Sequence, residues 1–305
     1  MNQARPRVAA VVVSYDGQAV VRQAVSSLRR MRYPAWELVV VDNGSRDGTR
    51  AALAAEFPDL TVLRLDENRG SAAGYNFGFG WAFEHGFDYV LLLNNDIEVE
   101  PDLLDELVKA AESDPAIGCV GPKCYYLADR RRLWSAGGIL RFRESITRER
   151  GMGEIDRGQY DEDADVDYVN GCAILIRRAA AEAAGAWDPL YFICVDDADF
   201  CTRVRRAGWR CRYAHRAVLY HMVALTTGPY TAPRNYQWGR STAIYVRRYA
   251  NLWNWLTFLF WTALAIPAAF LRETFRGNAG AVWGKLRGLW AGLRLKLAPA
   301  PPFSR

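Results

Sequence analysis

Short apolar runs alternate with amphipathic segments along the first third of the chain. The runs are rich in β-branched and aliphatic residues and are predicted to be strands, at 8–14, 36–41, 60–65 and 89–94. Apolar residues at helical spacing between and after them predict helices at 20–31, 49–57 and 101–113, and the small-residue loop at 68–74 is predicted to lead into a helix that ends at residue 85. This alternation indicates an α/β fold with a Rossmann-like, mainly parallel sheet and helices on both of its faces.

The pattern becomes irregular after Cys119. Residues 125–167 are rich in Arg, Asp, Glu and Gly, and we expect loops and short antiparallel strands there. Beyond them, a strand is predicted at 169–176, a helix at 197–207 and a further strand at 210–221.

The C-terminal part has a different character. Residues 252–271 carry no charged side chain, are long enough to span a bilayer, and have tryptophans and arginines near their ends. Residues 282–296 mix apolar and basic positions, as helices at a membrane interface do. The alternative is a helical hairpin that packs on the core or on a second subunit, forming a homodimer. We therefore predict two parts, 1–245 and 246–305, the second being helical and membrane-associated.

Composition places the chain among globular proteins, because 50% of its 305 residues are hydrophobic and 24% are charged. The formal net charge is only +5, but basic residues concentrate in 271–305, where Glu273 is the only acid. We expect this tail to meet an anionic membrane surface rather than nucleic acid. The six cysteines form no CxxC pair, so no zinc site is expected. The residues before the first strand lack the apolar core of a signal peptide, which favours a cytoplasmic location.

Asn94, Asn95 and Asp96 end the fourth apolar run abruptly. The run has no polar face and is predicted to be buried, so Asp96 lies at the carboxyl end of its strand, where open α/β sheets bind ligands. A carboxylate at this position suits a divalent cation, which can in turn hold a diphosphate. The alternative is an ordinary strand-to-turn junction, since Asn and Asp are frequent there.

Five segments, taken together and in their order, resemble the family 2 glycosyltransferases. The segments are residues 11–15, 39–49, 92–96, 170–173 and 195–201. The resemblance extends from residue 8 to about residue 245, and it implies the GT-A fold and a nucleotide-diphosphate-sugar donor. The Trp-Ser-Ala-Gly-Gly sequence at 134–138 and the Asn-Asn-Asp sequence resemble the rhamnosyltransferase-like branch of the family.

The resemblance implies a donor site at the ends of the first strands. Asp42 would accept the imide N–H of uracil or thymine, and its alternative role is the N-cap of the following helix. The small-residue loop that contains Arg69 would lie beside the nucleotide, with Arg69 pairing with phosphate, unless the loop is only a tightly packed helix start. The donor-binding residues predicted in this way are Ser14, Asp42, Asn68, Arg69, Gly70, Asn94, Asn95 and Arg240.

The resemblance also implies a divalent cation, Mn²⁺ or Mg²⁺, as cofactor. Asp96 would be its main ligand and His221 a second ligand, and the imidazole favours Mn²⁺. Asn94 stands where the family motif has its first acid, and an amide is a poorer ligand for a hard cation. The alternative for His221 is a satisfied core or turn histidine.

The acid cluster at 196–199 is the predicted catalytic element, because crowded and partly buried carboxylates raise each other's pKa. By resemblance, Asp197 is the base that deprotonates the acceptor, and Asp196 orients the acceptor. Asp199 is expected to pair with an arginine of the same helix. An acid-rich helix cap is the alternative for the whole cluster. The acceptor-binding residues predicted by resemblance are Gly171, Cys172, Asp196 and Trp187.

These expectations describe an inverting, metal-dependent enzyme that transfers a sugar from dTDP-rhamnose or a UDP-sugar. Rhamnose is the sugar that we predict first. The acceptor would be a growing polysaccharide or a lipid-linked saccharide, and the enzyme would be peripheral on the inner face of the cell membrane. The Asp-Asp pair departs from the Glu-Asp pair of the branch and also resembles galactofuranosyltransferases. A galactofuranosyl- or other hexosyltransferase is therefore the alternative. A catalytically silent nucleotide-sugar-binding module is the alternative from another class.

Overall fold

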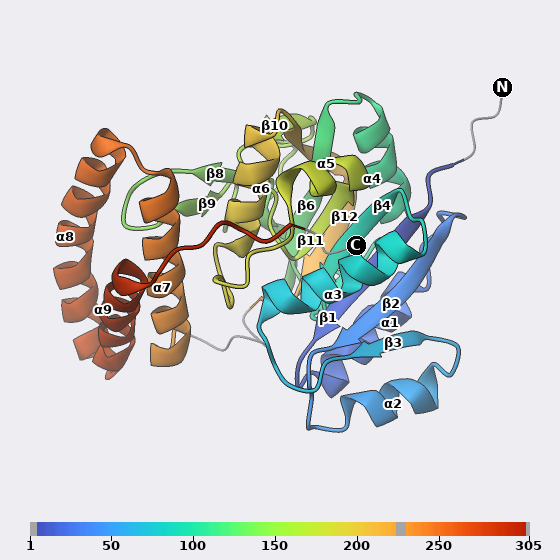
Figure 1. The fold of residues 1–305 in the computed structure, drawn as a ribbon, viewed down its shortest axis with the longest axis horizontal. Helices are drawn as coiled ribbons and strands as arrows, with labels where there is room; N and C mark the ends of the chain where they lie inside the picture. The colour runs from blue at the N-terminus through green and yellow to red at the C-terminus, as the bar shows by residue number, and fades with distance from the viewer. Residues whose placement is uncertain (1–4, 224–229, 303–305) are drawn as a thin grey trace.

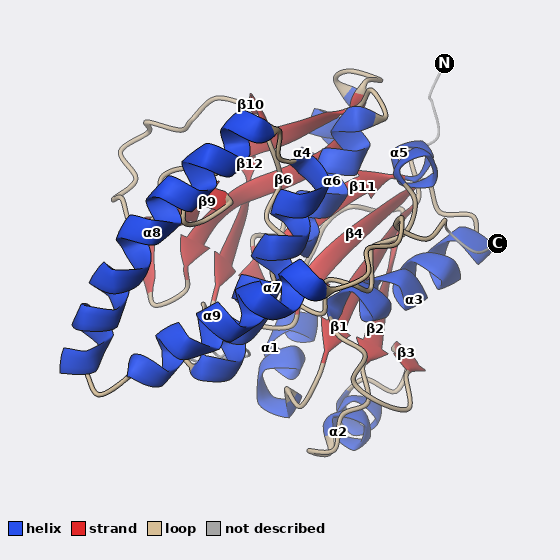
Figure 2. Ribbon diagram, turned by 60° about the vertical axis from the view of Figure 1, so that its left-hand side comes forward, coloured by secondary structure: helices blue, strands red, loops and turns tan. Residues whose placement is uncertain are grey.

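One mixed sheet with helices on both faces forms the centre of the protein, and three C-terminal helices lie to one side of it (Figure 1, Figure 2). The computed structural model describes residues 5–223 and 230–302. The strands are β1 (Val8–Ser14), β2 (Trp36–Asp42), β3 (Thr61–Arg64), β4 (Tyr89–Asn94), β5 (Ile97–Val99), β6 (Ile117–Tyr126), β7 (Asp129–Ser135), β8 (Gly138–Leu140), β9 (Thr147–Glu149), β10 (Ala164–Val166), β11 (Ala173–Arg177) and β12 (Arg210–His221). The helices are α1 (Gln18–Leu28), α2 (Thr49–Glu56), α3 (Ser71–Glu84), α4 (Leu103–Glu112), α5 (Arg178–Ala184), α6 (Asp196–Arg206), α7 (Ala232–Tyr249), α8 (Leu252–Phe275) and α9 (Ala279–Arg294).

The strand order places the ends of β1, β2 and β4 side by side. The order is β10-β12-β6-β11-β4-β1-β2-β3, with β5 paired to β12 and β7 paired to β6. β1 is parallel to both of its neighbours, so that Ser14 pairs with Asp42 and Val13 pairs with Asn94. β11 runs antiparallel to β4 and β6. The expected α/β architecture is confirmed, and the polar residues that end three strands share one edge of the sheet.

Helices bury their apolar stripes against both faces of this sheet. Apolar residues of α1 and α4 fill one core, and those of α3, α5 and α6 fill the other. Helix α3 comes close to β1, because a Cβ at Gly74 would lie 2.6 Å from Val13 Cγ1 and one at Gly78 would lie 2.3 Å from Val11 Cγ1. The small residues of α3 therefore set its distance from the sheet.

Two boundaries differ from those expected. β11 begins at Ala173 rather than at residue 169, because the chain turns at 170–172 before it enters the sheet. Helix α7 continues to Tyr249, so the expected division at residue 245 falls inside one helix. The short antiparallel strands expected in the irregular region are present as β7, β8, β9 and β10.

Helices α7 and α9 touch through their backbones. A Cβ at Gly288 would lie 2.0 Å from Tyr236 O, and a Cβ at Gly284 would lie 2.3 Å from Ala232 O. Glycines four residues apart lie on one helix face and allow this approach along the contact. Helix α9 thus packs directly on α7.

Helix α8 is mostly exposed, by contrast. Among the described residues it is the one helix whose length and composition would allow it to cross a membrane. After α9 the chain turns back across the molecule toward α5 (Figure 1), where Ala186 N donates a hydrogen bond to Pro301 O at 2.9 Å. In this returning segment, Ala298 O accepts a hydrogen bond from Arg248 Nη2 at 2.6 Å.

Candidate active site

Polar side chains from β1, β2 and the turn after β4 meet at the carboxyl edge of the sheet. Asn95 Nδ2 donates to Ser14 Oγ at 2.9 Å, and both side chains are buried. Asp42 is fully buried, and its Oδ1 accepts from Ser45 N at 2.9 Å. Its Oδ2 has no hydrogen-bond partner within 5–223 and 230–302. A buried carboxylate oxygen without a partner is costly, and it can accept an N–H from a ligand.

Asp47, rather than Asp42, accepts a hydrogen bond at the start of the helix that follows, whose N-cap residue is Gly48. Asp47 Oδ1 accepts from Thr49 N at 3.0 Å at the start of α2, and its Oδ2 accepts from Gln18 N at 2.9 Å at the start of α1. This hydrogen bonding removes the alternative role considered for Asp42.

Asn43 fixes the loop that contains Asn68, Arg69 and Gly70. Its Nδ2 donates to Gly70 O at 3.0 Å and to Asn68 Oδ1 at 3.2 Å, and its Oδ1 accepts from Arg69 N at 3.2 Å. Gly70 has a φ of +85°, and a Cβ there would lie 2.4 Å from Phe192 O, so only glycine fits. The loop is therefore held between the end of β2 and the segment that precedes α6.

Asp96 and His221 approach each other where β5 pairs with β12. His221 Nε2 lies 3.1 Å from Asp96 Oδ1 and 3.5 Å from Asn94 Nδ2. Both Asp96 and His221 are buried, and the register of the two strands sets His221 opposite Ile97. A carboxylate oxygen and an imidazole nitrogen at this separation form a donor set for a cation that accepts both atom types, such as Mn²⁺.

Asp197 lies in the first turn of α6 with both carboxylate oxygens hydrogen-bonded. Gly171 N donates to its Oδ2 at 3.0 Å, and Ala198 N donates to its Oδ1 at 2.8 Å. Burial, and next the charge of Asp196, raise the pKa of Asp197 well above its usual range, while the bond from Gly171 N opposes the rise. The residue nevertheless keeps part of its surface open. An accessible carboxylate of raised pKa is suited to general base catalysis.

Asp196 is held by a hydrogen bond from helix α3. Ser71 Oγ, at the start of α3, donates to Asp196 Oδ2 at 2.6 Å. Burial raises the pKa of Asp196, and this hydrogen bond opposes the rise. Ser71 N also donates to Phe192 O at 2.9 Å. Helix α3 thus connects the loop at residues 68–70 to the acid pair.

The backbone immediately before this pair is strained. Cys194 and Val195 have φ values of 69° and 62°, a region that L-residues rarely adopt and β-branched residues hardly ever. Such conformations cost on the order of 1–3 kcal/mol each and persist where the surrounding structure enforces them, often at functional sites. Val195 is buried, so packing fixes the turn that presents Asp196 and Asp197.

Tyr75, which sequence reasoning missed, lies near Asp96 and near the pair Asp196 and Asp197. Its hydroxyl lies 3.4 Å from Asn94 Oδ1. Burial, and next the charges of Asp196 and Asp197, raise the pKa of Tyr75 well above its usual range, and Asp96 acts in the same direction. The sequence offers only a tyrosine among the small residues of α3, which also fits a core position.

Two of the predicted acceptor-binding residues have buried side chains. Trp187 is fully buried and stacks on Phe200 with the ring centroids 4.5 Å apart. Cys172 is buried as well, and its sulfur lies 3.5 Å from Cys124 Sγ. Both side chains belong to the core, so a contact of either residue with an acceptor stays a prediction.

Two predicted donor-binding arginines have partners within the protein. The mostly exposed side chain of Arg69 lies 3.4 Å from Glu67 Oε1. Arg240, on α7, donates from Nη1 to Leu190 O at 2.6 Å. A role for either guanidinium in binding the diphosphate requires it to exchange these contacts, and stays a prediction.

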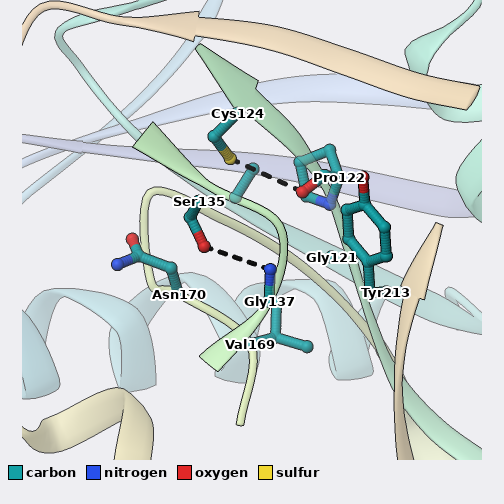
Figure 3. Close-up of a pocket in the computed structure, with 9 residues that line it drawn as sticks. Gly121, Pro122, Cys124, Ser135, Gly137, Val169, Asn170 and Tyr213 are labelled. Atoms are coloured by element: carbon teal, nitrogen blue, oxygen red, sulfur yellow. Dashed lines mark hydrogen bonds between the residues drawn. The ribbon is translucent and has the colours of Figure 1, made fainter. Parts of the chain in front are cut away.

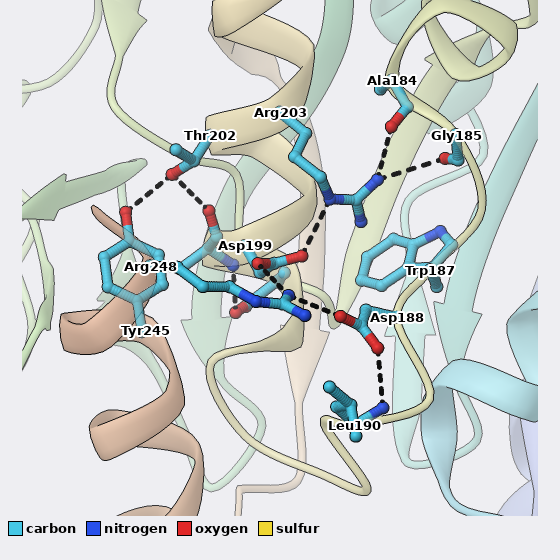
Figure 4. A network of polar contacts seen from close by, with 12 residues as sticks. Ala184, Gly185, Trp187, Asp188, Leu190, Asp199, Thr202, Arg203, Tyr245 and Arg248 are labelled. Atoms are coloured by element: carbon cyan, nitrogen blue, oxygen red, sulfur yellow. Dashed lines mark hydrogen bonds and ion pairs between the residues drawn. The ribbon is translucent and has the colours of Figure 1, made fainter. Parts of the chain in front are cut away.

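Asp199 is the centre of a buried ionic network that fixes α7 against α6 (Figure 4). Its Oδ2 lies 2.9 Å from Arg203 Nε, which confirms the expected pairing within the helix. Its Oδ1 accepts from Tyr249 OH at 2.7 Å and lies 3.3 Å from Arg248 Nη1. Arg248 also pairs with Asp188 at 2.5 Å. Because buried charges are tolerated only when they are paired, this network joins α7 to the helix that carries Asp197.

Three cysteine side chains, one of them on α6, lie close together in the core. The sulfur atoms of Cys119, Cys201 and Cys211 lie within 4.8 Å of one another, and all three residues are buried. Their spacing along the chain gave no sign of this cluster, because strand pairing and helix packing bring them together.

Solved structures with the same fold are glycosyltransferases. GalNAc-T7 in complex with UDP, GalNAc and Mn²⁺ matches with a TM-score of 0.63 at 14% identity, over 80% of this chain and 48% of its own. The mannosyltransferase PcManGT from Pyrobaculum calidifontis, in complex with GDP-Man and Mn²⁺, matches with a TM-score of 0.60 at 20% identity, over 96% of this chain and 88% of its own. At these identities the likeness establishes the fold.

Sequence comparison identifies the family within this fold. The model of Glycosyl transferase family 2 matches residues 9–185. An N-acetylglucosaminyl-diphospho-decaprenol L-rhamnosyltransferase of Mycobacterium tuberculosis is 26% identical over 269 residues, 83% of this chain and 87% of the relative. A poly-β-1,6-N-acetyl-D-glucosamine synthase of Staphylococcus aureus is 24% identical over 220 residues, 72% of this chain and 50% of the relative.

The GT-A fold, together with acidic residues at the carboxyl edge of its sheet, defines the class of this protein: it is a glycosyltransferase. The chain belongs to glycosyltransferase family 2, whose model covers more than half of its length. The resemblance found in the sequence is thereby confirmed.

Proposed function

We propose that the protein is an inverting, metal-dependent rhamnosyltransferase that acts on a lipid-linked saccharide or a growing polysaccharide. The observation that carries the reaction is Asp197, an enclosed carboxylate of raised pKa that keeps part of its surface open. A single base of this kind supports direct displacement at the anomeric carbon.

In this reaction Asp197 removes the proton of an acceptor hydroxyl while the hydroxyl oxygen bonds to the anomeric carbon of the donor. The bond from the anomeric carbon to the diphosphate oxygen breaks, and its electron pair leaves with the nucleoside diphosphate. Asp196, held by Ser71, orients the acceptor beside the base. Attack opposite the leaving group inverts the anomeric configuration.

Asp96 and His221 would hold the cation. Their ligand atoms are 3.1 Å apart and buried, and an oxygen–nitrogen pair favours Mn²⁺ over Mg²⁺. The bound cation supplies positive charge that stabilises the departing diphosphate.

The unpartnered Oδ2 of Asp42 supports a uracil or thymine nucleotide, because the imide N–H of either base is the donor that this oxygen lacks. The name of the mycobacterial relative, an L-rhamnosyltransferase that acts on a diphospho-decaprenol saccharide, supports both the sugar and the lipid-linked acceptor. The Asp-Asp pair at 196–197 keeps galactofuranose as the competing sugar.

A thermal-shift panel tests the donor assignment with dTDP-rhamnose and UDP-galactofuranose, each with and without Mn²⁺. We expect dTDP-rhamnose with Mn²⁺ to raise the melting temperature most, because a ligand stabilises the state that binds it. Equal or greater stabilisation by UDP-galactofuranose would show that the sugar assignment is wrong. Binding without transfer or donor hydrolysis, for every donor, would favour the catalytically silent binding module.

We also propose that α8 and α9 seat the enzyme on the inner face of the membrane. The exposed apolar residues of α8 are Leu252, Trp253, Leu256, Leu259, Phe260, Trp261, Leu264, Phe270, Leu271 and Phe275. Arginines accompany the aromatic rings: Arg143 lies over Trp261 at 4.7 Å, and Arg294 lies over Trp290 at 3.9 Å. An apolar face with a basic rim suits an anionic bilayer surface.

Flotation with vesicles that contain anionic lipid tests this seating in the full chain. We expect Trp253→Ser/Phe260→Ser to lose most of its vesicle binding, because these side chains are 71% and 59% exposed on one apolar helix. Met152→Ser, at an exposed apolar position outside the tail, is the matched control. Unchanged flotation together with a concentration-dependent dimer would instead identify α8 as a subunit interface.

A further inference from the structure

The Trp-Ser-Ala-Gly-Gly segment at 134–138 has so far no role in the site, although it lies beside both groups of functional residues. The ring of Trp134 meets that of His221 edge to face, with the centroids 5.9 Å apart. A Cβ at Gly138 would lie 2.1 Å from the ring of Tyr168, so that position must be glycine for Tyr168 to pack there. The segment thus connects the metal-ligand candidate to the strand ends near α6.

Glu149, on β9, is the buried carboxylate toward which this segment is organised. Three side chains donate hydrogen bonds to it: Ser135 Oγ, Tyr168 OH at 2.5 Å and Asn170 Nδ2 at 2.9 Å. Glu149 is 8% exposed, and burial raises its pKa while the three hydrogen bonds oppose the rise. Three converging donors are the environment of an ionised carboxylate.

The hydrogen bonds continue from Glu149 to the base. Asn170, held by Glu149 through its Nδ2, accepts from Cys172 N at 2.9 Å through its Oδ1. These bonds fix the turn at 170–172, and the middle residue of that turn, Gly171, donates its N–H to Asp197 Oδ2 at 3.0 Å. Any rotation of the turn would move this N–H away from Asp197.

Little space remains for the network to relax. Ser135 and Asn170 line a small cavity of about 10 Å³, which has room for roughly one water molecule (Figure 3). Gly137 N donates to Ser135 Oγ at 3.2 Å in this cavity, and that bond directs the hydroxyl proton of Ser135 toward Glu149.

The hairpin that carries Glu149 is fixed at its other end by the C-terminal helices. Lys285 Nζ donates to Glu144 O at 3.0 Å, and the ring of Phe142 lies against that of Tyr245 with the centroids 6.1 Å apart. Glu149 therefore belongs to a hairpin held at both ends.

We propose that Glu149 is a positioning residue for the reaction, which acts through Asn170 to hold the turn whose Gly171 N–H orients Asp197. The proposal rests on the proposed role of Asp197 as base. Glu149 does not touch the reacting atoms, so its loss is expected to slow the chemical step and to leave donor binding unchanged.

The test is a double-mutant cycle with Glu149→Gln, Asn170→Ala and the double variant in the full chain. In the first variant the charge of the carboxylate is removed, so the hydrogen bond from Asn170 Nδ2 joins two neutral groups and weakens. We expect kcat to fall by about 10–100-fold, as it does when a catalytic group is displaced slightly, with an unchanged KM for the donor. The double variant should lose no more than the more damaging single variant, because both changes act on one chain of contacts. Glu154→Gln, an exposed acid of the same region, is the matched control and should behave as wild type.

Amide hydrogen exchange at residues 170–172 separates this proposal from the proposed function. Faster exchange in Glu149→Gln than in wild type is expected, and unchanged exchange together with wild-type kcat would overturn the proposal while leaving the enzyme assignment intact. Additive losses in the cycle would also overturn it. If wild type transfers no sugar, the proposed function fails, and exchange at 170–172 still decides whether Glu149 holds the turn. If Glu149→Gln does not fold, Asn170→Ala alone must show the loss of kcat at constant donor KM.

Discussion

The half proposed to bind the donor, from β1 to β4, and the half proposed to carry the base, from β6 to β12, place their functional groups in different ways, and we call them the donor half and the catalytic half. In the donor half, Ser14 and Asp42 directly end buried parallel strands, and Asp96 follows β4 within two residues. In the catalytic half, the contacts that place Asp197 and Glu149 join segments 26 and 21 residues apart. In the first half the functional side chains lie at or next to strand ends, whereas in the second half they depend on turns outside the sheet and on the hydrogen bonds that hold those turns.

The two halves also differ in how much unfavourable free energy they contain. Backbone strain is present at Cys194 and Val195, and the pKa values of Asp196 and Asp197 are raised first by burial. In the donor half, Asp42 leaves one buried oxygen unpaired, which a nucleobase would satisfy. Binding a donor should therefore relieve the cost in one half, whereas the cost in the other half persists because it makes Asp197 a better base.

The largest expected effect is that of Asp197→Asn. An amide cannot take up the proton of the acceptor, so kcat should fall by about 10²–10⁴-fold. The donor-induced thermal shift should stay unchanged, because the donor half is untouched. Transfer rates and thermal shifts on the same preparation measure both. A loss of donor binding equal to the loss of rate would contradict the division into two halves.

Asp197→Asn should also raise the melting temperature at neutral pH. The raised pKa of Asp197 means that the folded state holds its proton more tightly than the unfolded state does. Above that pKa the folded protein must accommodate an unfavourable anion, and this cost disappears as the pH falls below the usual range of an aspartate. The stabilisation of the variant should therefore shrink as the pH is lowered, as melting curves over a pH series would show. A constant stabilisation at all pH values would contradict the assigned ionisation.

Asp42→Asn tests the donor half and should have the next largest effect. Because Oδ1 already accepts from Ser45 N, the amide nitrogen takes the place of the unpartnered Oδ2 and faces the imide N–H of the base as a second donor. The KM for the donor should rise by about 10–100-fold, the value of a hydrogen bond to a charged group, with little change in kcat. Asp66→Asn, an exposed acid near the same edge, is the control. A fall in kcat at constant KM would show that Asp42 acts in the chemical step rather than in donor binding, and would contradict its place in the donor half.

The same difference explains what the sequence could predict. The strands β1 to β4 and the polar residues at their ends follow from local patterns, since an apolar run and the residue that ends it are adjacent in the chain. Asp96 and Asp197 were predicted in this way, with help from the family resemblance. The burial of Trp187 was not predicted, because a tryptophan beside a turn gives no sign of whether it is buried.

The residues that sequence reasoning missed are those whose roles depend on distant contacts. Tyr75 meets Asn94 from a helix, and Glu149 meets Asn170 from a hairpin inside the irregular region. Neither residue type nor spacing marks them, because a tyrosine in a helix and an acid in a charged segment are both ordinary. The motif at 134–138 was noticed as a resemblance, but its physical reason appeared only with the packing of Gly138 against Tyr168.

The smallest effect is expected for Ser71→Ala, which cuts a hydrogen bond between the two halves. Burial raises the pKa of Asp196, and the hydrogen bond from Ser71 opposes that rise, so its removal should raise this pKa further. Because Asp196 and Asp197 titrate together, the acidic limb of the kcat profile should move to higher pH. Activity should fall a few-fold near that limb and approach the wild-type value at higher pH, where both carboxylates are ionised. Ser113→Ala, which removes a bond to Ala110 O at the end of α4, is the control. An equal loss of kcat at every pH would mean that Ser71 supports the position of Asp196 rather than its charge. The hydrogen bond from Ser71 would then be one of the contacts between distant segments that position the residues of the catalytic half.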